Sequence, residues 1–324
     1  FVLRFNVDFR WRKAFRQCRR KAYHIAFREL SCIGDAAMTL AYNPSNLFAV
    51  KVWEVEYRKT AKRTLIARIY QPQGAGPFPV LLDLHGGAWS RKDRYANEPM
   101  ARAIAASGML VVSPDLRLSD EAPYPACVQD ASYALRWLKH KAKELNGDPT
   151  HFGILGSSSG GHVAQLLGMR PRHALYNEIP LPEAPNLDCS VAYVATRSPI
   201  SNPVTRRAQA EKMKNTEMMK KSDTFFSPPD SIHEGNPHEI LERKEKVTLP
   251  PMLIMQGGED NNVIPPIQEK FAAAYRAAGG ECQLEIFPGC EHEWTATPGP
   301  DADRSHEMVK AFIAKQLRAL QKAA

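Results

Sequence analysis

The sequence predicts an α/β protein: a mostly parallel central sheet with helices on both faces and an inserted cap. From about residue 50, strand-like and helix-like segments alternate along the chain, as they do in proteins built from strand–helix–strand units. Some of the strand-like segments are short, continuous apolar runs, which is typical of strands buried on both faces of a sheet. The 324 residues, 44% hydrophobic and 24% charged, fit one large domain with an insertion better than two independent domains.

Eight segments have the character of strands. The first two alternate apolar and polar residues, and the second of them stops at a proline. The third and fourth, at 76–84 and 108–116, are the continuous apolar runs. In order, the predicted strands cover residues 50–58, 64–72, 76–84, 108–116, 151–156, 187–195, 251–258 and 282–289.

Helix-like segments separate most of these strands. The clearest has apolar residues at helical spacing, from Val128 to Leu138, and ends at Asn146-Gly147, a good C-terminal stop. The last predicted helix carries its apolar residues on one face. The predicted helices cover residues 97–107, 126–147, 162–169, 266–280 and 302–322.

Two parts of the chain do not follow this alternation. Residues 197–250, rich in Pro, Lys, Met and Asn, predict an inserted cap over one end of the sheet. Residues 1–37 carry nine Lys or Arg and three Asp or Glu, and so contribute +6 of the net charge of +8. Such a segment faintly resembles a transit peptide or an amphipathic surface helix. We favour a basic extension that is not native, because the chain begins with Phe1 and Met38 is a plausible start, which leaves 38–324 as the main α/β domain.

The charge distribution argues against a nucleic-acid partner, because the chain beyond the extension has a net charge of only +2. Arginines interrupt each apolar run near the N-terminus, so we expect no secretory signal. Because we favour a non-native extension, we also expect no membrane contact through that segment. The six cysteines form no CxxC pair, which favours reduced thiols and a cytoplasmic protein. A bridge between Cys282 and Cys290, on either side of a predicted strand, stays open, as does a homodimer.

The segment "GSSSG", residues 156–160, fits the pattern G-x-S-x-G with Ser158 at its centre. An apolar strand precedes it and a helix follows it. This strand–turn–helix context is what a nucleophile elbow requires, because the backbone turns sharply there and needs small neighbours. A serine-rich structural or phosphate-binding turn is the alternative. The helix N-terminus would place partial positive charge near the hydroxyl.

A nucleophilic serine needs a histidine and a carboxylate, which in this strand–helix arrangement follow it in the order Ser, acid, His. Asp260 follows one predicted strand and His292 follows the next. Their loops leave the sheet at the same edge as Ser158. Glu259 is an alternative acid. The other histidines are less suitable, since His162 follows the elbow and is expected to pack or hydrogen-bond there.

The segment "HGGAW", residues 85–89, follows the apolar run "PVLLDL". Acyl transfer requires backbone N–H donors for the oxyanion. The residue after the nucleophile, Ser159, supplies one donor, and glycines in an early loop let the backbone approach the substrate. We therefore expect Gly86, Gly87 and Ala88 to shape an oxyanion loop.

Four aromatic residues are candidates for an acyl or aryl pocket, although packing of the core or cap explains each equally well. They are Trp89, Trp294, Phe225 and Phe226. A run of lysines is predicted to be the solvated face of a cap helix: Lys212, Lys214, Lys220 and Lys221. The His and Cys residues lack the spacing of metal ligands, and no GxGxxG or P-loop is present, so we expect no metal and no cofactor.

Together, "HGGAW", "GSSSGGHVA", "GGEDNNV" and "PGCEHEW" resemble α/β-hydrolase esterases of the hormone-sensitive-lipase-like and feruloyl-esterase-like groups, over about residues 50–320. The resemblance implies a triad of Ser158, Asp260 and His292. It also implies an oxyanion hole of Gly87, Ala88 and Ser159. The expected activity is a carboxylesterase for small-molecule esters with short-chain acyl or aryl groups.

The sequence departs from the lipase-like motif in two places. Ala88 replaces the third glycine, giving an HGGxW pattern that also occurs in arylformamidases, and Ser159 stands where alanine is more usual. The same triad would serve arylformamidase, another amide or carbamate hydrolase, or a peptidase. A non-catalytic ligand-binding protein on the same fold is a more distant alternative.

Overall fold

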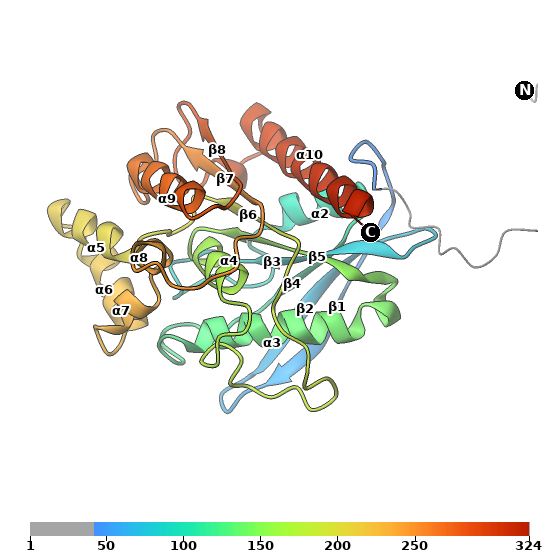
Figure 1. The fold of residues 1–324 in the computed structure, drawn as a ribbon, viewed down its shortest axis with the longest axis horizontal. Coiled ribbons are helices and arrows are strands. Elements are labelled where there is room, and N and C mark those ends of the chain that lie inside the picture. The colour runs from blue at the N-terminus through green and yellow to red at the C-terminus, as the bar shows by residue number, and fades with distance from the viewer. Residues whose placement is uncertain (1–41, 324) are drawn as a thin grey trace, which may run out of the picture. The chain divides into compact units, whose positions relative to one another are not determined.

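The computed structural model describes residues 42–323. The predictions made for residues 1–37 and for Met38 lie outside the described residues. The described part contains an eight-stranded sheet with strand order β1-β2-β4-β3-β5-β6-β7-β8, whose strands are labelled in Figure 1. The strands are β1 (Val50–Lys59), β2 (Thr64–Pro72), β3 (Phe78–Leu84), β4 (Leu110–Pro114), β5 (Gly147–Ser157), β6 (Tyr193–Arg197), β7 (Met252–Gly257) and β8 (Cys282–Phe287).

The sheet is mostly parallel, as predicted. β2 runs antiparallel to β1 and to β4, and the pairs from β4 through β3 to β8 are all parallel. Consequently the loops after β3, β5, β6, β7 and β8 leave the sheet at the same edge. This edge is where ligands bind in open α/β sheets.

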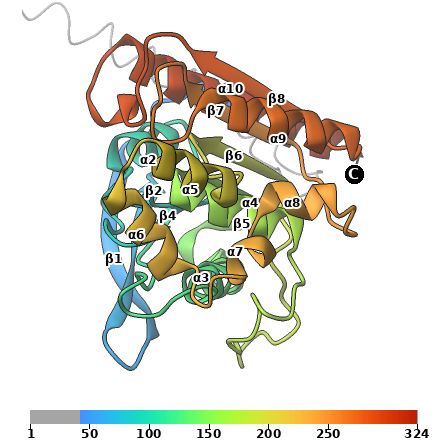
Figure 2. The same cartoon turned by 90° about the vertical axis from the view of Figure 1, so that its left-hand side faces the viewer.

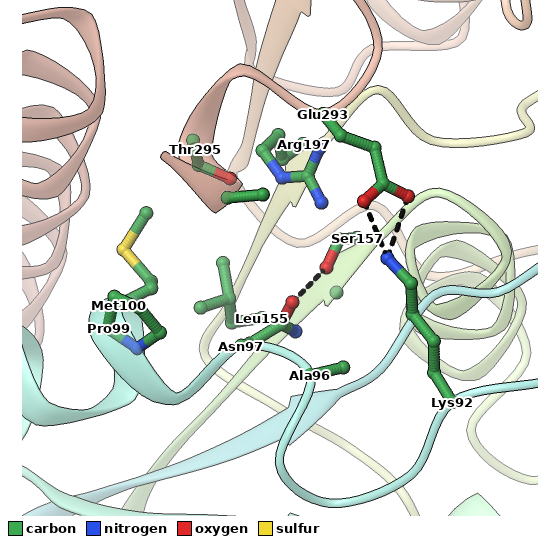
Figure 3. Close-up of a pocket in the computed structure, with 12 residues that line it drawn as sticks. Lys92, Ala96, Asn97, Pro99, Met100, Leu155, Ser157, Arg197, Glu293 and Thr295 are labelled. Carbon is green, nitrogen blue, oxygen red and sulfur yellow. Dashed lines mark hydrogen bonds and ion pairs between the residues drawn. The ribbon is translucent and has the colours of Figure 1, made fainter. Parts of the chain in front are cut away.

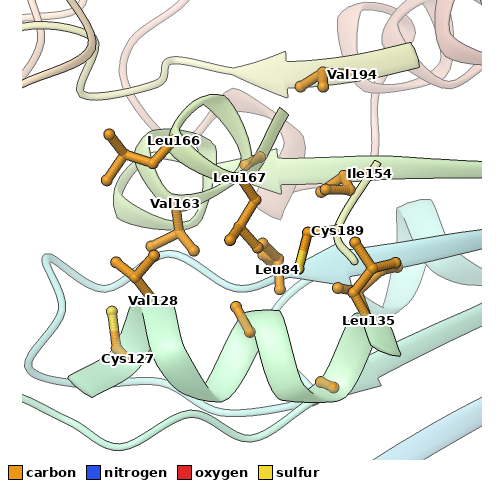
Figure 4. Close-up of a cluster of buried hydrophobic side chains, with 14 of the residues drawn as sticks. Leu84, Cys127, Val128, Leu135, Ile154, Val163, Leu166, Leu167, Cys189 and Val194 are labelled. Atoms are coloured by element: carbon orange, nitrogen blue, oxygen red, sulfur yellow. The ribbon is translucent and has the colours of Figure 1, made fainter. Parts of the chain in front are cut away.

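Helices cover both faces of the sheet (Figures 1 and 2). α2 and α10 pack on one face, and α3, α4 and α9 on the other, because each has an apolar side in the corresponding core cluster. Figure 4 shows part of the core cluster on the face covered by α3, α4 and α9, where α3 and α4 meet the sheet. The bounds of these helices are α2 (Glu98–Ala106), α3 (Ala126–Lys141), α4 (Ser159–Met169), α9 (Pro265–Ala277) and α10 (Pro300–Ala323).

Residues between β6 and β7 form four short helices, which we call the cap. They are α5 (Pro203–Lys212), α6 (Thr216–Phe225), α7 (Ser231–Glu234) and α8 (Pro237–Glu242). Asn202, Asn215 and Asn236 cap α5, α6 and α8, each with its side-chain oxygen accepting from backbone N–H groups of the first turn. The cap helices gather beside the end of the sheet in both views (Figures 1 and 2).

The lysine run lies on α5, α6 and the turn between them. Lys212, Lys214 and Lys220 are exposed, whereas Lys221 is half-buried and pairs with Glu217. This agrees with a solvated face.

Several element boundaries differ from the prediction. β5 begins at Gly147 and not at 151, and α4 begins at Ser159 and not at 162. The helix predicted over 126–147 ends at Lys141, a 3-10 turn follows, and Asn146 takes a left-handed conformation with φ of 59°. Gly147 then opens β5, where a Cβ would lie 2.9 Å from Val80 Cγ2, so a side chain does not fit. β6 begins at Tyr193 and not at 187, because the residues before it form no ladder.

Cys282 and Cys290 are both free, so the bridge considered between them is absent. In the part of the chain that the structure describes, no helix combines the length and the apolar character needed to span a bilayer.

Candidate active site

Ser158 lies at the sharp turn between β5 and α4, with φ of 53° and ψ of −117°. The flanking glycines are needed for close packing. A Cβ on Gly156 would lie 2.4 Å from the carbonyl oxygen of Gly160, and one on Gly160 would lie 2.2 Å from that of Leu84. Side chains at these positions would force the backbone apart. The G-x-S-x-G pattern is therefore a steric requirement of this turn.

The structure brings the three predicted triad residues into one hydrogen-bonded chain. Ser158 Oγ lies 2.9 Å from His292 Nε2, and His292 Nδ1 lies 2.7 Å from Asp260 Oδ2. The first contact is suited to proton transfer from the hydroxyl to the imidazole. The second orients the ring with its proton on Nδ1.

Asp260 is held in a dense set of donors. Its Oδ1 accepts from the amides of Asn262 and Val263 at 2.9 and 2.8 Å, and Gln256 Nε2 donates to Oδ2 at 3.0 Å. Burial alone would raise the pKa of the Asp260 carboxyl. Its contact with His292 and the hydrogen bond from Val263 outweigh burial and hold that pKa below its usual range. Asp260 is therefore ionised and ready to stabilise an imidazolium.

Glu259, the alternative acid, is exposed and is not the carboxylate that contacts His292. Among the described residues, no histidine other than His292 is hydrogen-bonded to Ser158 Oγ. His162 is fully buried, where it accepts from Trp89 Nε1 at 3.2 Å and contacts the carbonyl oxygen of Gly235 at 2.6 Å. It packs and hydrogen-bonds behind the elbow, as expected.

The loop after β3 approaches the nucleophile closely. A Cβ on Gly86 would lie 3.2 Å from Ser158 Cβ, so only glycine allows this contact without displacement. Gly87 and Ala88 have positive φ values, 107° and 52°, and these conformations turn the chain back over the elbow. Among the described residues, the amides of Gly87, Ala88 and Ser159 donate to no protein acceptor. They are free to bind an oxyanion.

The four candidate pocket aromatics do not form one pocket wall. Trp89, Phe225 and Phe226 form what we call the aromatic cluster, in which the Trp89 and Phe225 rings stack at 4.4 Å between centroids and 1° between planes. All three are at least 97% buried. This favours the packing interpretation. The cavity that Trp89 lines, beside Gly86 and Ser159, measures about 10 Å³, which is room for one water at most.

Trp294 lies apart from the aromatic cluster. Its ring packs on Phe287 at 5.2 Å between centroids, and the Arg197 guanidinium lies 5.5 Å from its centroid. It follows His292 by two residues, so it helps to fix the loop that carries the histidine.

Sequence reasoning missed two arginines that contact the site. Arg206 of α5 donates to Asn262 Oδ1 at 3.0 and 2.8 Å, and thereby ties the cap to the loop that holds Asp260. Arg197, at the end of β6, donates from Nη1 to the carbonyl oxygen of His292 at 2.6 Å. The only local signal for Arg197 is a charged residue at the carboxyl end of a buried strand.

Comparison with known proteins identifies the family. The family model BD-FAE matches residues 68–274, more than half of the chain. The chain belongs to the BD-FAE family. The matched region contains Ser158 and Asp260 but ends before His292, so the histidine is assigned from the geometry above.

Curated relatives of this BD-FAE protein include esterases. The carboxylesterase NlhH of Mycobacterium tuberculosis is 39% identical over 107 residues, which cover 32% of this chain and 34% of that protein. The esterase LipC of the same organism is 24% identical over 244 residues, covering 73% of this chain and 58% of that protein. The chain thus matches about a third of the length of NlhH and less than two thirds of LipC.

Solved structures share the fold. Esterase B from Lactobacillus rhamnosis has a TM-score of 0.70 at 19% identity, with 96% of each chain covered. A thermophilic esterase from Thermogutta terrifontis has a TM-score of 0.64 at 24% identity, covering 83% of this chain and 94% of that one. The fold is the α/β-hydrolase fold that the resemblance implied.

Proposed function

We propose that this BD-FAE protein is a serine hydrolase that cleaves carboxylic esters with short-chain acyl or aryl groups. The single observation that carries the proposal is the chain from Ser158 to His292 to Asp260 beside unoccupied backbone donors. The names of the relatives, a carboxylesterase and an esterase, support it. The small volume of the cavities next to the elbow supports short groups.

The geometry suits a two-step reaction. Ser158 Oγ attacks the carbonyl carbon while His292 Nε2 takes the hydroxyl proton. The amides of Gly87, Ala88 and Ser159 donate to the oxyanion, and loss of one such donor costs ~3 kcal/mol of transition-state stabilisation. His292 then gives the proton to the departing alkoxide, and an acyl group remains on Ser158.

Deacylation repeats these roles with water. His292 takes a proton from water, the hydroxide attacks the acyl carbonyl, and the same donors hold the second oxyanion. Collapse of this intermediate returns the proton to Ser158 and releases the carboxylic acid. Asp260 stays ionised throughout and stabilises the imidazolium in both steps.

The test is hydrolysis of p-nitrophenyl esters from C2 to C12, with N-formylkynurenine alongside, by wild type and Ser158→Ala. Turnover that peaks at short chains and vanishes in the variant supports the proposal. Preference for the formamide would favour arylformamidase, the alternative that the HGGxW pattern raises. Inertness of wild type on every substrate would contradict hydrolysis and favour a ligand-binding protein.

We also infer a reducing compartment such as the cytoplasm. Support comes from the described cysteines, which are unpaired: Cys127, Cys189, Cys282 and Cys290. A disulfide among them in protein isolated without reductant would argue against this location.

A further inference from the structure

A cavity of about 120 Å³ lies beside the triad, and we call it the Arg197 cavity (Figure 3). The loop before α2, the ends of β5 and β6, and the loop after His292 enclose it. Figure 3 shows apolar side chains on one side and an ion pair on the other. The residues that matter here are Lys92, Asn97, Met100, Leu155, Arg197 and Glu293.

Arg197 is a buried cation with few partners. The residue is 8% exposed, and a guanidinium has five N–H donors. One of these donors, on Nη1, is hydrogen-bonded to the carbonyl oxygen of His292. Among the described residues, no carboxylate oxygen lies within 4.0 Å of it. Burial lowers the pKa of the guanidinium, and the more distant carboxylates of Glu293, Asp260 and Asp83 only partly oppose this effect.

The nearby acidic groups are engaged elsewhere. Both oxygens of Glu293 lie 2.7 Å from Lys92 Nζ. Asp83 accepts from Asn97 at 2.8 Å and from Ser113 at 2.9 Å, and burial raises its pKa to about 6. Asp260 serves His292. The remaining donors of Arg197 therefore face the cavity without an anion from the protein.

We propose that the Arg197 cavity is a subsite for a small carboxylate. A planar guanidinium matches a carboxylate through parallel N–H···O bonds. Met100 and Leu155 offer apolar contact for a short hydrocarbon stem. The volume is smaller than the ~150 Å³ cavity that accepts benzene, which favours a short stem of two or three carbons.

Arg197 connects the cavity to both reacting residues, whose chain neighbours Ser157 and Glu293 line it. The carbonyl oxygen of Arg197 accepts from the amide of Ser158 at 2.8 Å, while its side chain holds the His292 loop. Two sources can supply the carboxylate. It is carried by the ester, as in a half-ester of a dicarboxylic acid, or it is a free acid such as the released product. Only the first source rests on the proposed function.

Binding tests the free acid without catalysis. Calorimetry would measure propionate and succinate binding to Ser158→Ala protein, with chloride as the comparison anion. We expect millimolar carboxylate binding that weakens at least tenfold when Arg197→Met is added. Arg172→Met is the matched control, because Arg172 is exposed and pairs with Asp188 outside the cavity. Arg197→Lys, which keeps the charge without the fork, covers the case in which Arg197→Met does not fold, and we expect it to weaken binding severalfold.

Selectivity tests the substrate source. A pH-stat would give kcat/KM for monoethyl succinate and for ethyl valerate, a neutral ester of similar length. Loss of His292 positioning in an Arg197 variant would lower both values together, whereas loss of the subsite lowers the ratio of the first to the second at least tenfold. If carboxylates bind and Arg197 variants lower this ratio, the carboxylate belongs to the substrate. If carboxylates bind and the ratio is unchanged, the ligand is a free acid.

The outcomes are separable. Absence of carboxylate binding to Ser158→Ala together with an unchanged ratio would overturn the subsite and leave water as the occupant. Carboxylate binding by a protein that hydrolyses no ester would retain the subsite and overturn the proposed function alone.

Discussion

Two regions flank Ser158 at the carboxyl edge of the sheet, the aromatic cluster on one face and the Arg197 cavity on the other. In the first, Trp89 and Phe225 stack and leave about 10 Å³ beside the oxyanion loop. In the second, about 120 Å³ remains next to a buried guanidinium. Aromatic rings fill space by packing, whereas donors of a buried charge that lack a protein partner are stabilised by a polar ligand or water. The comparison indicates that one side supplies rigidity and the other supplies room for a ligand.

Asp260→Asn is expected to give the largest effect and tests the triad between the two regions. An amide in place of the carboxylate favours the wrong imidazole tautomer, and the expected loss in kcat is about 10⁴-fold. Ester hydrolysis rates measure it. Glu259→Gln is the matched control and should stay within about threefold, because Glu259 is exposed. Equal losses in both variants would refute the assignment of the acid.

Phe225→Ala tests whether the aromatic cluster is packing. The ring is fully buried against Trp89, so its removal should lower the free energy of unfolding by ~3–5 kcal/mol. Urea denaturation measures this, and Leu47→Ala, at an 89% exposed residue, should change it by less than about 0.5 kcal/mol. A shifted acyl-length preference with little loss of stability would instead make Phe225 a pocket wall.

The pH dependence of stability distinguishes the two regions, because His162 contacts the aromatic cluster and Asp83 contacts Asn97 at the Arg197 cavity. Burial lowers the pKa of His162 to about 4, so between pH 6.5 and 4 the unfolded chain binds the additional proton and stability falls on acidification. The contribution of His162 is up to ~3 kcal/mol. Asp83 acts in the opposite direction, because its pKa is raised to about 6, and offsets part of the loss.

Denaturation at several pH values checks this contribution by comparing wild type with His162→Gln. The variant should lose stability less steeply than wild type between pH 6.5 and 4. An identical slope in both proteins would show that His162 does not titrate in this way.

Lys92→Met is expected to give the smallest effect. Its ion pair with Glu293 is partly exposed, at 28% and 42% for the two side chains, so the unfolding free energy should fall by ~1 kcal/mol or less. Salt screens such pairs, and the Debye length is only about 4 Å in 0.5 M NaCl. The difference in unfolding free energy between Lys92→Met and wild type should therefore shrink at this salt concentration. A loss of about 3 kcal/mol that salt leaves unchanged would mean that the pair holds the Arg197 cavity together.

The sequence predicted the parts of the site that depend on local signals. Ser158 follows β5 directly, and Asp260 and His292 lie in the loops after β7 and β8. Parallel strands deliver such residues to one edge of the sheet. The close glycine contacts at Gly156 and Gly160 leave a visible motif for the same reason. The first contact joins residues that are near in sequence, and the second joins the start of α4 to the end of β3, the strand beside β5.

The missed features depend on contacts between distant segments. Arg197 and His292 are 95 residues apart, and Arg206 and Asn262 are 56 apart, so no spacing links them. The cap helices were predicted only as an insertion. None is longer than ten residues, which is too short for a sustained apolar period to be recognised in the sequence. The N-termini of α5, α6 and α8 are set by Asn caps. The aromatic cluster joins the loop after β3 to α6, and composition alone could not distinguish packing from a pocket.

The most direct test of the central claim is to trap the acyl group on Ser158. Protein mixed with p-nitrophenyl acetate and quenched in acid would be digested and analysed by mass spectrometry. The triad predicts a burst of p-nitrophenol and an acetyl group on the peptide that contains Ser158, with neither in Ser158→Ala. Acetylation at another residue, or the same turnover in Ser158→Ala, would contradict the assignment of Ser158 as the nucleophile.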